Sequence, residues 1–591
     1  MGGGLAVAGP APLERDRQQA RRGTSRASLT VPLLALAGYC GLSALLFGRG
    51  TLGDLAHVVE GFGQAPPYYG HDQSAYVWSL AWAARALAHL QNPFLTHEIF
   101  APAGYNLAWA ASLLGPGILF SPITHVFGAV VSYNLLALAA PAVAAWTAFL
   151  LCRHVSGRVA PALAGGLLFG FGTYGSGEAI NHLNLALVAL VPLAVLLVLR
   201  RHAGLMRRGR FVIALGLLLG LQFWTSTEVF ASLALFGGVA FLLAALFADS
   251  ERRRAIGTCA VETLGALLLA LVLAGPYLYY ALRYPNPVSG IATADAGADL
   301  ANFVIPSQVT GLHGSGWIAA DAAQLHGNLT EQLAYLGVPL ILLLGAYAVE
   351  FRGSRLARGL LVFVVVGVLM SLGAHVYLDG NATGIALPWS ILGELPLLRF
   401  ASPDRFVLYV WLAAALVVAC WLARPRRAVA RWALFTLVVV SLAPNLTGVP
   451  WATRVDAPRL LATPALARYV PTGSTVLALP FGIAGDSMFW QVEADFRFRL
   501  AGGYISTGVP AAYEPYIHFI HPLEGGLVWS RARQQLCAFA AMTGADVILL
   551  REHSHGYWPQ LLGPLGVHAR RAGGFLIYPL DGVEGRRACR S

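Results

Sequence analysis

Residues 183–227 read LNLALVALVPLAVLLVL (183–199), RRHAGLMRRGR (200–210) and FVIALGLLLGLQFWTST (211–227). The first and third of these stretches are apolar runs close to the length that a helix needs to cross the hydrocarbon core of a bilayer. The middle part is short and carries five arginines. Apolar, basic and apolar segments in this order are typical of two transmembrane helices joined by a cytoplasmic loop.

The same kind of apolar run recurs along the whole chain. Of the 591 residues, 57% are hydrophobic and only 12% are charged, about half the charged fraction of a soluble protein. The pattern therefore predicts a polytopic α-helical membrane protein with about 11 transmembrane helices. We expect these spans at 29–47, 131–152, 159–175, 183–199, 211–227, 229–248, 257–280, 333–349, 359–375, 404–422 and 431–448.

Arginine clusters fall in alternate loops between these runs. Cytoplasmic loops carry an excess of basic residues, so the alternation predicts a cytoplasmic N-terminus, with residues 1–28 as a basic tail and the first run as an uncleaved anchor. The formal charge of +11 then reflects membrane topology, and we expect a lipid bilayer and no nucleic acid as partner. The clusters are Arg15–Arg26, Arg153/Arg158, Arg200–Arg210, Arg252–Arg254, Arg352–Arg358 and Arg424–Arg431.

One further apolar segment, Leu113–Phe127 (LLGPGILFSPITHVF), would reverse the orientation of every later loop if it crossed the membrane. Its Gly-Pro-Gly and Ser-Pro breaks are unusual in a regular span. We therefore predict an interfacial or re-entrant helix here, within a long first outer loop at 50–130.

The spans divide the chain into a transmembrane domain at 29–450 and an extracytoplasmic α/β domain at 451–591. Strands are predicted at Val476–Leu479, Val547–Leu550 and Phe575–Tyr578, and a helix at Arg531–Met542. No nucleophile elbow, phosphate-binding loop or zinc pattern occurs there, so we expect binding or scaffolding rather than the reaction centre. Whether Cys537 and Cys589 pair depends on the redox state of the compartment.

Asp72 is the first candidate for a catalytic role. It stands in YYGHDQSAYVWSLAW, directly before a predicted amphipathic helix on the outer side. Aspartate at such a position often caps the helix. The functional alternative is a carboxylate at the membrane surface that accepts a proton from an incoming hydroxyl group.

Five further outer positions are candidates for substrate binding. Glu178 and His182 lie in GSGEAINHLNL, where they either cap helix ends or join Asp72 in a site. Glu228 has almost no loop to occupy, and an ionisable residue at that depth is a functional candidate. Arg399 and Arg405 either extend from helix ends to the membrane interface or bind a phosphate. The forked guanidinium group of arginine suits the oxygen atoms of a phosphate.

The order of several short motifs resembles the GT-C superfamily of membrane glycosyltransferases, in particular its bacterial branch related to lipoteichoic-acid-modifying, aminoarabinose and mannosyl transferases. The motifs are His71-Asp72-Gln73, Asn92-Pro93, Pro102–Trp109, Pro122 with Phe127-Gly128, Asn181–Leu185, Ala334–Gly337, and Leu395-Pro396 with Arg399 and Arg405. The resemblance runs in layout from about residue 30 to 450.

This resemblance implies a transferase that moves a sugar, with inversion, from a polyprenyl-phosphate donor to a cell-envelope glycan, lipid or protein outside the bacterial inner membrane. Asp72 would be the general base, Arg399 and Arg405 would hold the donor phosphate, and Glu178, His182 and Glu228 would line the cavity. Some relatives use an acidic pair in the first loop, but Gln73 follows Asp72 here, which leaves a divalent metal cofactor open. A transporter or lipid flippase and a non-catalytic scaffold of the same fold are the alternatives.

Overall fold

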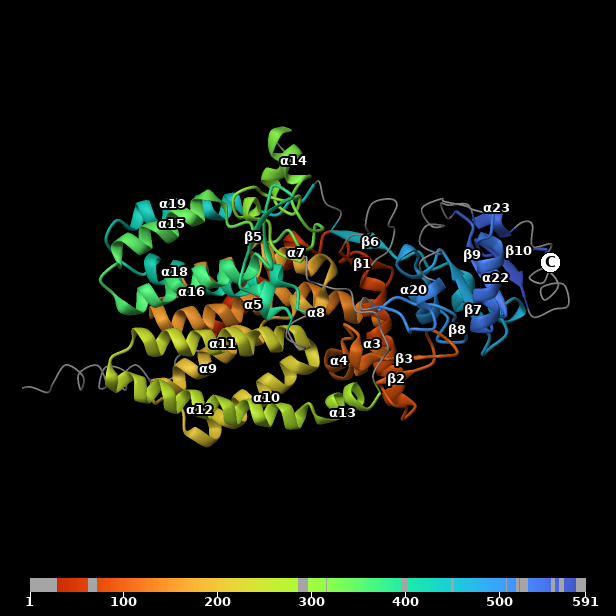
Figure 1. Cartoon of the computed structure of the whole chain (residues 1–591), viewed down its shortest axis with the longest axis horizontal. Coiled ribbons are helices and arrows are strands. Elements are labelled where there is room, and N and C mark those ends of the chain that lie inside the picture. The colour runs from red at the N-terminus through yellow and green to blue at the C-terminus, as the bar shows by residue number, and fades with distance from the viewer. Residues whose placement is uncertain are drawn as a thin grey trace, which may run out of the picture.

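The computed structural model describes residues 29–61, 72–284, 296–314, 316–394, 401–447, 451–505, 508–516, 520, 530–553, 558–562 and 568–580. A helical body occupies one half of the molecule and a region built on a sheet occupies the other (Figure 1). The helix α3 (Asp72–Ala88) lies between the two halves.

The helical body follows the predicted apolar runs. Its helices are α2 (Thr30–Leu46), α4 (Leu114–Phe127), α5 (Ala129–Ser156), α6 (Val159–Phe171), α7 (Thr173–Asn181), α8 (Leu183–Ala186), α9 (Leu190–His202), α10 (Arg208–Thr225), α11 (Thr227–Phe247), α12 (Ser250–Leu273), α13 (Gly275–Arg283), α14 (Gly316–Ala322), α15 (Gly337–Glu350), α16 (Arg355–Ser371), α17 (Trp389–Leu392), α18 (Val407–Leu422) and α19 (Ala428–Ser441).

A helix lies in each of the eleven predicted spans, and the described part of the chain is mostly helical, as expected. Five of the described helical segments are both long and apolar enough to cross a membrane: Ala129–Ser156, Leu183–His202, Thr227–Phe247, Ser250–Leu273 and Pro403–Leu422. Leu113–Phe127 forms the helix α4, with Pro122 inside it. The number of crossings, the orientation of the chain and the interfacial position of α4 stay predictions.

Exposed apolar side chains cover the outside of the body. On α12, Val261, Leu264, Leu268 and Val272 are each more than half exposed and follow one another at helical spacing along one face. A soluble protein rarely exposes a continuous apolar stripe of this kind, whereas lipid chains solvate it without cost. The outer faces of the helical body therefore fit a lipid environment.

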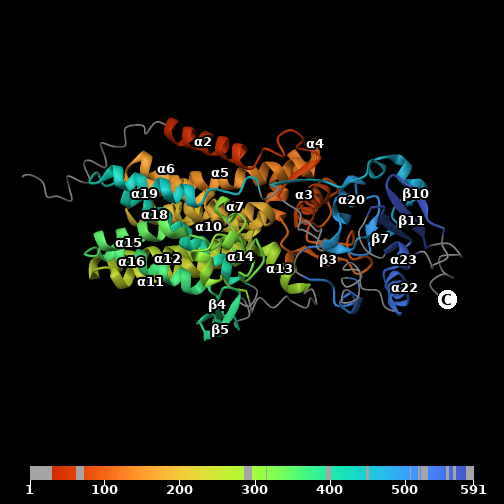
Figure 2. The same ribbon diagram turned by 90° about the horizontal axis from the view of Figure 1, so that it is seen from above.

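The centre of the body is packed through small residues. The helix α6 contacts α5 on one side and α18 on another, and α2 lies beside α5 (Figure 2). A Cβ atom added at Gly166 would lie 2.5 Å from the carbonyl oxygen of Ala145, and one at Gly170 would lie 2.3 Å from that of Pro141. Glycine at these positions lets the helix backbones approach as closely as they do.

The C-terminal part contains a mixed five-stranded sheet in the order β10-β11-β9-β7-β8. Its strands are β7 (Thr475–Leu479), β8 (Arg499–Leu500), β9 (Val547–Arg551), β10 (Arg570–Ala572) and β11 (Phe575–Pro579), with the helices α20 (Ser487–Glu493), α22 (Ala532–Thr543) and α23 (Trp558–Leu562). The pairs β7–β9 and β7–β8 are parallel, and the remaining pairs are antiparallel. The predicted strands and the predicted helix of this part are confirmed, but Cys589 lies outside the described residues, so its pairing with Cys537 stays a prediction.

Three pairs of short strands lie outside this sheet. The strand β1 (Val58–Glu60) pairs with β6 (Ala452–Arg454), β2 (Leu95–Thr96) pairs with β3 (Tyr105–Asn106), and β4 (His375–Leu378) pairs with β5 (Asn381–Ala386). The pair β1–β6 joins the start of the first predicted outer loop to the start of the C-terminal part.

One hydrophobic core runs through the C-terminal sheet and the first predicted outer loop. Trp78 and Trp82 of α3 belong to the same buried cluster as Val476 and Leu549 of the sheet. The indole of Trp78 donates a hydrogen bond of 2.6 Å to Oε1 of Gln491 in α20, and Gln491 is fully buried. The position of α3 is therefore fixed by the helical body and the C-terminal sheet together.

Candidate active site

The N-terminal end of α3 forms one side of the candidate site, and Asp72 is the first residue of this helix. Every residue from Gln73 to Leu80 is buried, because α3 packs against α4, α5 and α20 on different sides. The Asp72 side chain is only 11% exposed. A carboxylate at this depth needs hydrogen-bond partners, since burying an unpaired charge is costly.

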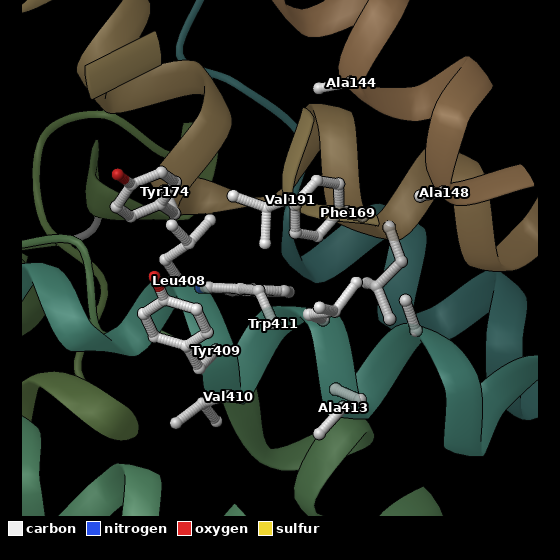
Figure 3. Packing of buried hydrophobic residues seen from close by; sticks show 14 of the residues in the cluster. Ala144, Ala148, Phe169, Tyr174, Val191, Leu408, Tyr409, Val410, Trp411 and Ala413 are labelled. Atoms are coloured by element: carbon white, nitrogen blue, oxygen red, sulfur yellow. The ribbon is translucent and has the colours of Figure 1, made fainter. Parts of the chain in front are cut away.

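A second side of the site forms where the chain breaks between α6 and α7. The break falls at Gly172, where an added Cβ atom would lie 2.9 Å from ring carbons of Trp411. The indole of Trp411 is fully buried and packs among Phe169, Tyr174 and Val191 (Figure 3). This close approach lets the short helix α7 start in a new direction and carry Glu178 toward α3.

His182, between α7 and α8, links two carboxylates. Its Nδ1 atom lies 2.9 Å from Oε2 of Glu178, and its Nε2 atom lies 3.3 Å from Oδ2 of Asp72. Glu178 is fully buried and the His182 side chain is 15% exposed. Because each ring nitrogen faces a carboxylate oxygen, both nitrogens act as donors, which is the protonated form of the ring.

Two polar pairs hold α3 against this turn. Nε2 of Gln73 donates to Oδ1 of Asn181 over 3.0 Å, and the hydroxyl group of Tyr76 donates to Oδ1 of Asn184 over 2.6 Å. All four side chains are buried. Together with the contact between Asp72 and His182, they fix the relative position of the two elements by more than one bond.

The other carboxylate oxygen of Asp72 is bound by the C-terminal part of the chain. The phenol of Tyr504 donates a hydrogen bond of 2.5 Å to Oδ1 of Asp72. Tyr504 follows β8 in the sequence, 432 residues after Asp72. The carboxylate therefore lies between a donor from the helical body and a donor from the C-terminal part.

A charged pair lies near the group formed by Asp72, His182 and Glu178. Nη1 of Arg405 donates to Oε2 of Glu228 over 2.7 Å, at the N-terminal end of α11. Nε of Arg405 and Oε1 of Glu178 are both buried, and neither has a hydrogen-bond partner within the described residues. The Arg405 charge also acts on Asp72 and His182. One donor and one acceptor in this cluster are thus available to a ligand.

The hydrogen bonds of the site favour the charged forms of Asp72 and His182. Burial alone disfavours the Asp72 carboxylate, but the bonds from His182 and Tyr504 outweigh it and lower the pKa of Asp72. Burial likewise opposes the His182 charge, but the bonds to Asp72 and Glu178 outweigh it and raise the pKa of His182 to about 10. At neutral pH Asp72 is therefore a carboxylate and His182 an imidazolium.

Comparison with solved structures places this arrangement in a known fold. The chain aligns over 93% of its length with arabinofuranosyltransferase AftD from Mycobacteria, with a TM-score of 0.60 and 14% identity. It aligns over the same share with the Archaeoglobus fulgidus oligosaccharyltransferase AglB bound to an inhibitory peptide and a dolichol-phosphate, and with an apo structure of the oligosaccharyltransferase from that organism (TM-scores 0.51 and 0.50; 12% and 13% identity). The chain has the GT-C fold.

This GT-C chain spans 40% of the length of AftD and 74% of each of the two oligosaccharyltransferase chains. No protein-family model matches the sequence, and no curated protein matches it. The likeness thus lies in the path of the backbone, as the resemblance of the motifs predicted.

The donor set of this GT-C site does not fit a metal ion as it is arranged. Both ring nitrogens of His182 are directed at carboxylates, at distances that suit hydrogen bonds, so Asp72, His182 and Glu178 do not converge on a common point. Within the described ranges, no group of three His, Cys, Asp or Glu side chains is placed to hold a metal. We therefore derive no step through a metal.

The structure brings most of the candidate residues together. Asp72, Glu178 and His182 form one hydrogen-bonded group, and Glu228 and Arg405 form a pair beside it. Arg399 lies outside the described residues. Tyr504 was missed because nothing in its local sequence marks it, apart from two preceding glycines, of which Gly502 lies close to the Phe481 ring and Gly503 lies close to Ile99.

Proposed function

We propose that this chain is a membrane glycosyltransferase that moves one sugar from a polyprenyl-phosphate donor to an acceptor hydroxyl outside the cytoplasm. The observation that carries the proposal is the Asp72 carboxylate, held between His182 and Tyr504 where the helical body meets the C-terminal part. The fold shared with three solved glycosyltransferase structures supports the reaction class.

In the proposed reaction, Asp72 is the general base. A carboxylate has about four lone-pair positions, so the two bonds to His182 and Tyr504 leave room for an acceptor hydroxyl group. Asp72 takes the hydroxyl proton while the acceptor oxygen forms a bond to C1 of the sugar. The bond from C1 to the phosphate oxygen breaks, and the electron pair leaves with the polyprenyl phosphate. This single displacement inverts the configuration at C1.

The neighbouring charges suit the departing phosphate. His182 and Arg405 are cations of the site, and Nε of Arg405 is a donor without a partner among the described residues. Cations near the leaving oxygen stabilise the negative charge that develops there. Oε1 of Glu178 is an acceptor available to a sugar hydroxyl, and Glu228 orients the Arg405 guanidinium. Arg399 is proposed as a second phosphate ligand.

The topology proposed with this function has the N-terminus in the cytoplasm and the C-terminal part outside a bacterial inner membrane. The acceptor is then a component of the cell envelope. AglB was solved with a dolichol-phosphate and a peptide, which supports a lipid-linked donor on the same fold. A basic N-terminal tail and arginine-rich loops on one side of the membrane support the orientation.

The release of polyprenyl phosphate tests the proposal for any sugar. The purified protein, in bilayer nanodiscs with a delipidated cell-envelope fraction as acceptor, would receive short-chain polyprenyl phosphates carrying radiolabelled arabinofuranose, mannose or galactose. We expect one donor to lose its label to the envelope fraction while free polyprenyl phosphate accumulates, and a heat-inactivated sample to show neither. If no donor of a wider panel is consumed by well-folded protein, the proposal is wrong.

A further inference from the structure

The contact between Tyr504 and Asp72 joins two residues of the site that lie 432 positions apart in the sequence. Tyr504 belongs to neither the helical body nor the first outer loop, and no motif of the sequence marks it. Its hydroxyl group nevertheless makes a bond of 2.5 Å to Oδ1 of Asp72, shorter than the 3.3 Å between His182 and Oδ2. A short bond to a charged oxygen is among the stronger hydrogen bonds in proteins.

The backbone before Tyr504 is anchored to the first outer loop. The N–H group of Leu500 donates to the carbonyl of Glu98 over 2.8 Å, that of Ala101 to the carbonyl of Leu500 over 3.0 Å, and that of Phe100 to the carbonyl of Gly502 over 2.9 Å. Gly503 has a φ of +150°, and a Cβ atom there would lie 3.1 Å from Cβ of Ile99. The chain is therefore led along the loop to the position from which Tyr504 reaches Asp72.

The phenol of Tyr504 is suited to donate a hydrogen bond to Asp72. It is not suited to act as the base that takes the proton of the acceptor hydroxyl group. Burial and the Asp72 charge raise the pKa of Tyr504 well above its ordinary value, so the hydroxyl group stays protonated over the physiological range. A protonated phenol that donates to a carboxylate stabilises the ionised form and fixes its orientation. Both effects act on Asp72 and need no contact between Tyr504 and a substrate.

Resting on the proposed function, we infer that Tyr504 is a positioning residue of the transferase site, through which the C-terminal part orients Asp72 for proton transfer. The C-terminal part then completes the active site, in addition to any role in binding the acceptor. The charged and titratable groups that act on Asp72 or respond to its charge are His182 of the α7–α8 turn, Tyr504, Arg405 before α18, Tyr76 of α3 and Tyr133 of α5, with Glu178 behind His182.

The ionisation of Asp72 can be measured without any substrate. Infrared difference spectra of the full chain in nanodiscs, recorded between about pH 1 and pH 7, contain the carboxylic acid band of Asp72, which is assigned as the band missing in Asp72→Asn. We expect Tyr504→Phe to move the midpoint of this band up by about one pH unit or more, since a hydrogen bond to a charged group is worth that much. In a transfer assay, the acid limb of the pH–rate profile would move in the same direction.

Tyr513→Phe is the matched control. It also removes a buried phenol bond from the C-terminal part to the first outer loop, namely the 2.6 Å bond from Tyr513 to the carbonyl of Ala101, but it leaves Asp72 alone. The inference holds if only Tyr504→Phe shifts the band. An unshifted band, or equal shifts in both variants, would overturn it. Because the infrared measurement needs no transfer, a failure of the proposed function would show separately, as donor that is not consumed.

Discussion

At the scale of single residues, the pH dependence of the site follows from His182. Its folded pKa of about 10 lies above the ordinary 6.5, because Asp72 and Glu178 favour the charged ring. A raised histidine pKa contributes stability that is fully present below about pH 6.5 and is lost as the pH rises through about 10. Asp72 has the opposite sign: its lowered pKa contributes stability that is lost when the pH falls into the acidic range.

The prediction for His182→Gln concerns how the stability of the folded protein changes as the pH rises from 6 to about 10. Glutamine cannot carry the charge, so the variant should unfold at a lower temperature than wild type at pH 6, and the difference should shrink as the pH approaches about 10. Thermal unfolding of the detergent-solubilised protein at a series of pH values measures this. A difference that stays constant from pH 6 to about pH 10, or that grows, would mean that His182 is neutral in the folded protein.

The residues of the site illustrate what one sequence can reveal. Glu178 and His182 were expected on the same side as Asp72 because alternating arginine loops fix which helix ends share a side. Sequence reasoning could not pair Nδ1 with Glu178 and Nε2 with Asp72, since that depends on the direction of α7 after Gly172. Tyr504 was out of reach, because a contact across 432 residues leaves no local pattern.

At the scale of elements, the apolar runs located the helices well because a helix in lipid must be both long and apolar, which few other structures are. The break at Gly172 was not predicted: 159–175 reads as one run, but the chain forms α6 and then α7. The reason lies in packing, since the space beside Gly172 is filled by Trp411 of α18, a helix that is far away in the sequence.

The small residues of α6 give a prediction about helix packing. Gly170→Ala would bring a methyl group within 2.3 Å of the carbonyl of Pro141 and 2.6 Å of Cβ of Ala145, so α6 must move away from α5. We expect a loss of about 1–3 kcal/mol in the free energy of unfolding, the usual cost of overpacking. The midpoint of thermal unfolding in detergent, with monodispersity on gel filtration, is the measurement.

Gly38→Ala on α2 is the control for this change. Nothing lies within 4 Å of a Cβ atom there, so the same methyl group should be neutral or slightly stabilising through helix propensity. Equal stability of the two variants would show that α5 and α6 are less closely packed than described.

At the scale of the whole molecule, the site belongs to no single part. Asp72 comes from the first outer loop, Glu178 and His182 from the helical body, and Tyr504 from the C-terminal part. A buried hydrophobic cluster shared by α3 and the C-terminal sheet holds these parts in place. The apolar runs are of membrane length before about residue 450 and of strand length after it, and this difference predicts the two-part layout. The sequence predicts binding or scaffolding for the C-terminal part, and the role inferred for Tyr504 would add a contribution to the reaction.

The most direct test of the central claim is the transfer rate of Asp72→Asn. Asparagine keeps the size of the side chain, but it cannot accept a proton from the acceptor hydroxyl group. Asp54→Asn is the matched control, because Asp54 lies in the same loop and pairs with His57 and Arg454 at the surface, away from the site. Both variants should be inserted in the membrane at wild-type levels.

If Asp72 is the general base, Asp72→Asn should lose transfer by at least about 100-fold, the usual contribution of a positioned base, while Asp54→Asn keeps it. The assay is the transfer of labelled sugar and the release of polyprenyl phosphate by equal amounts of folded protein. Transfer near the wild-type rate by well-expressed Asp72→Asn protein would contradict the account.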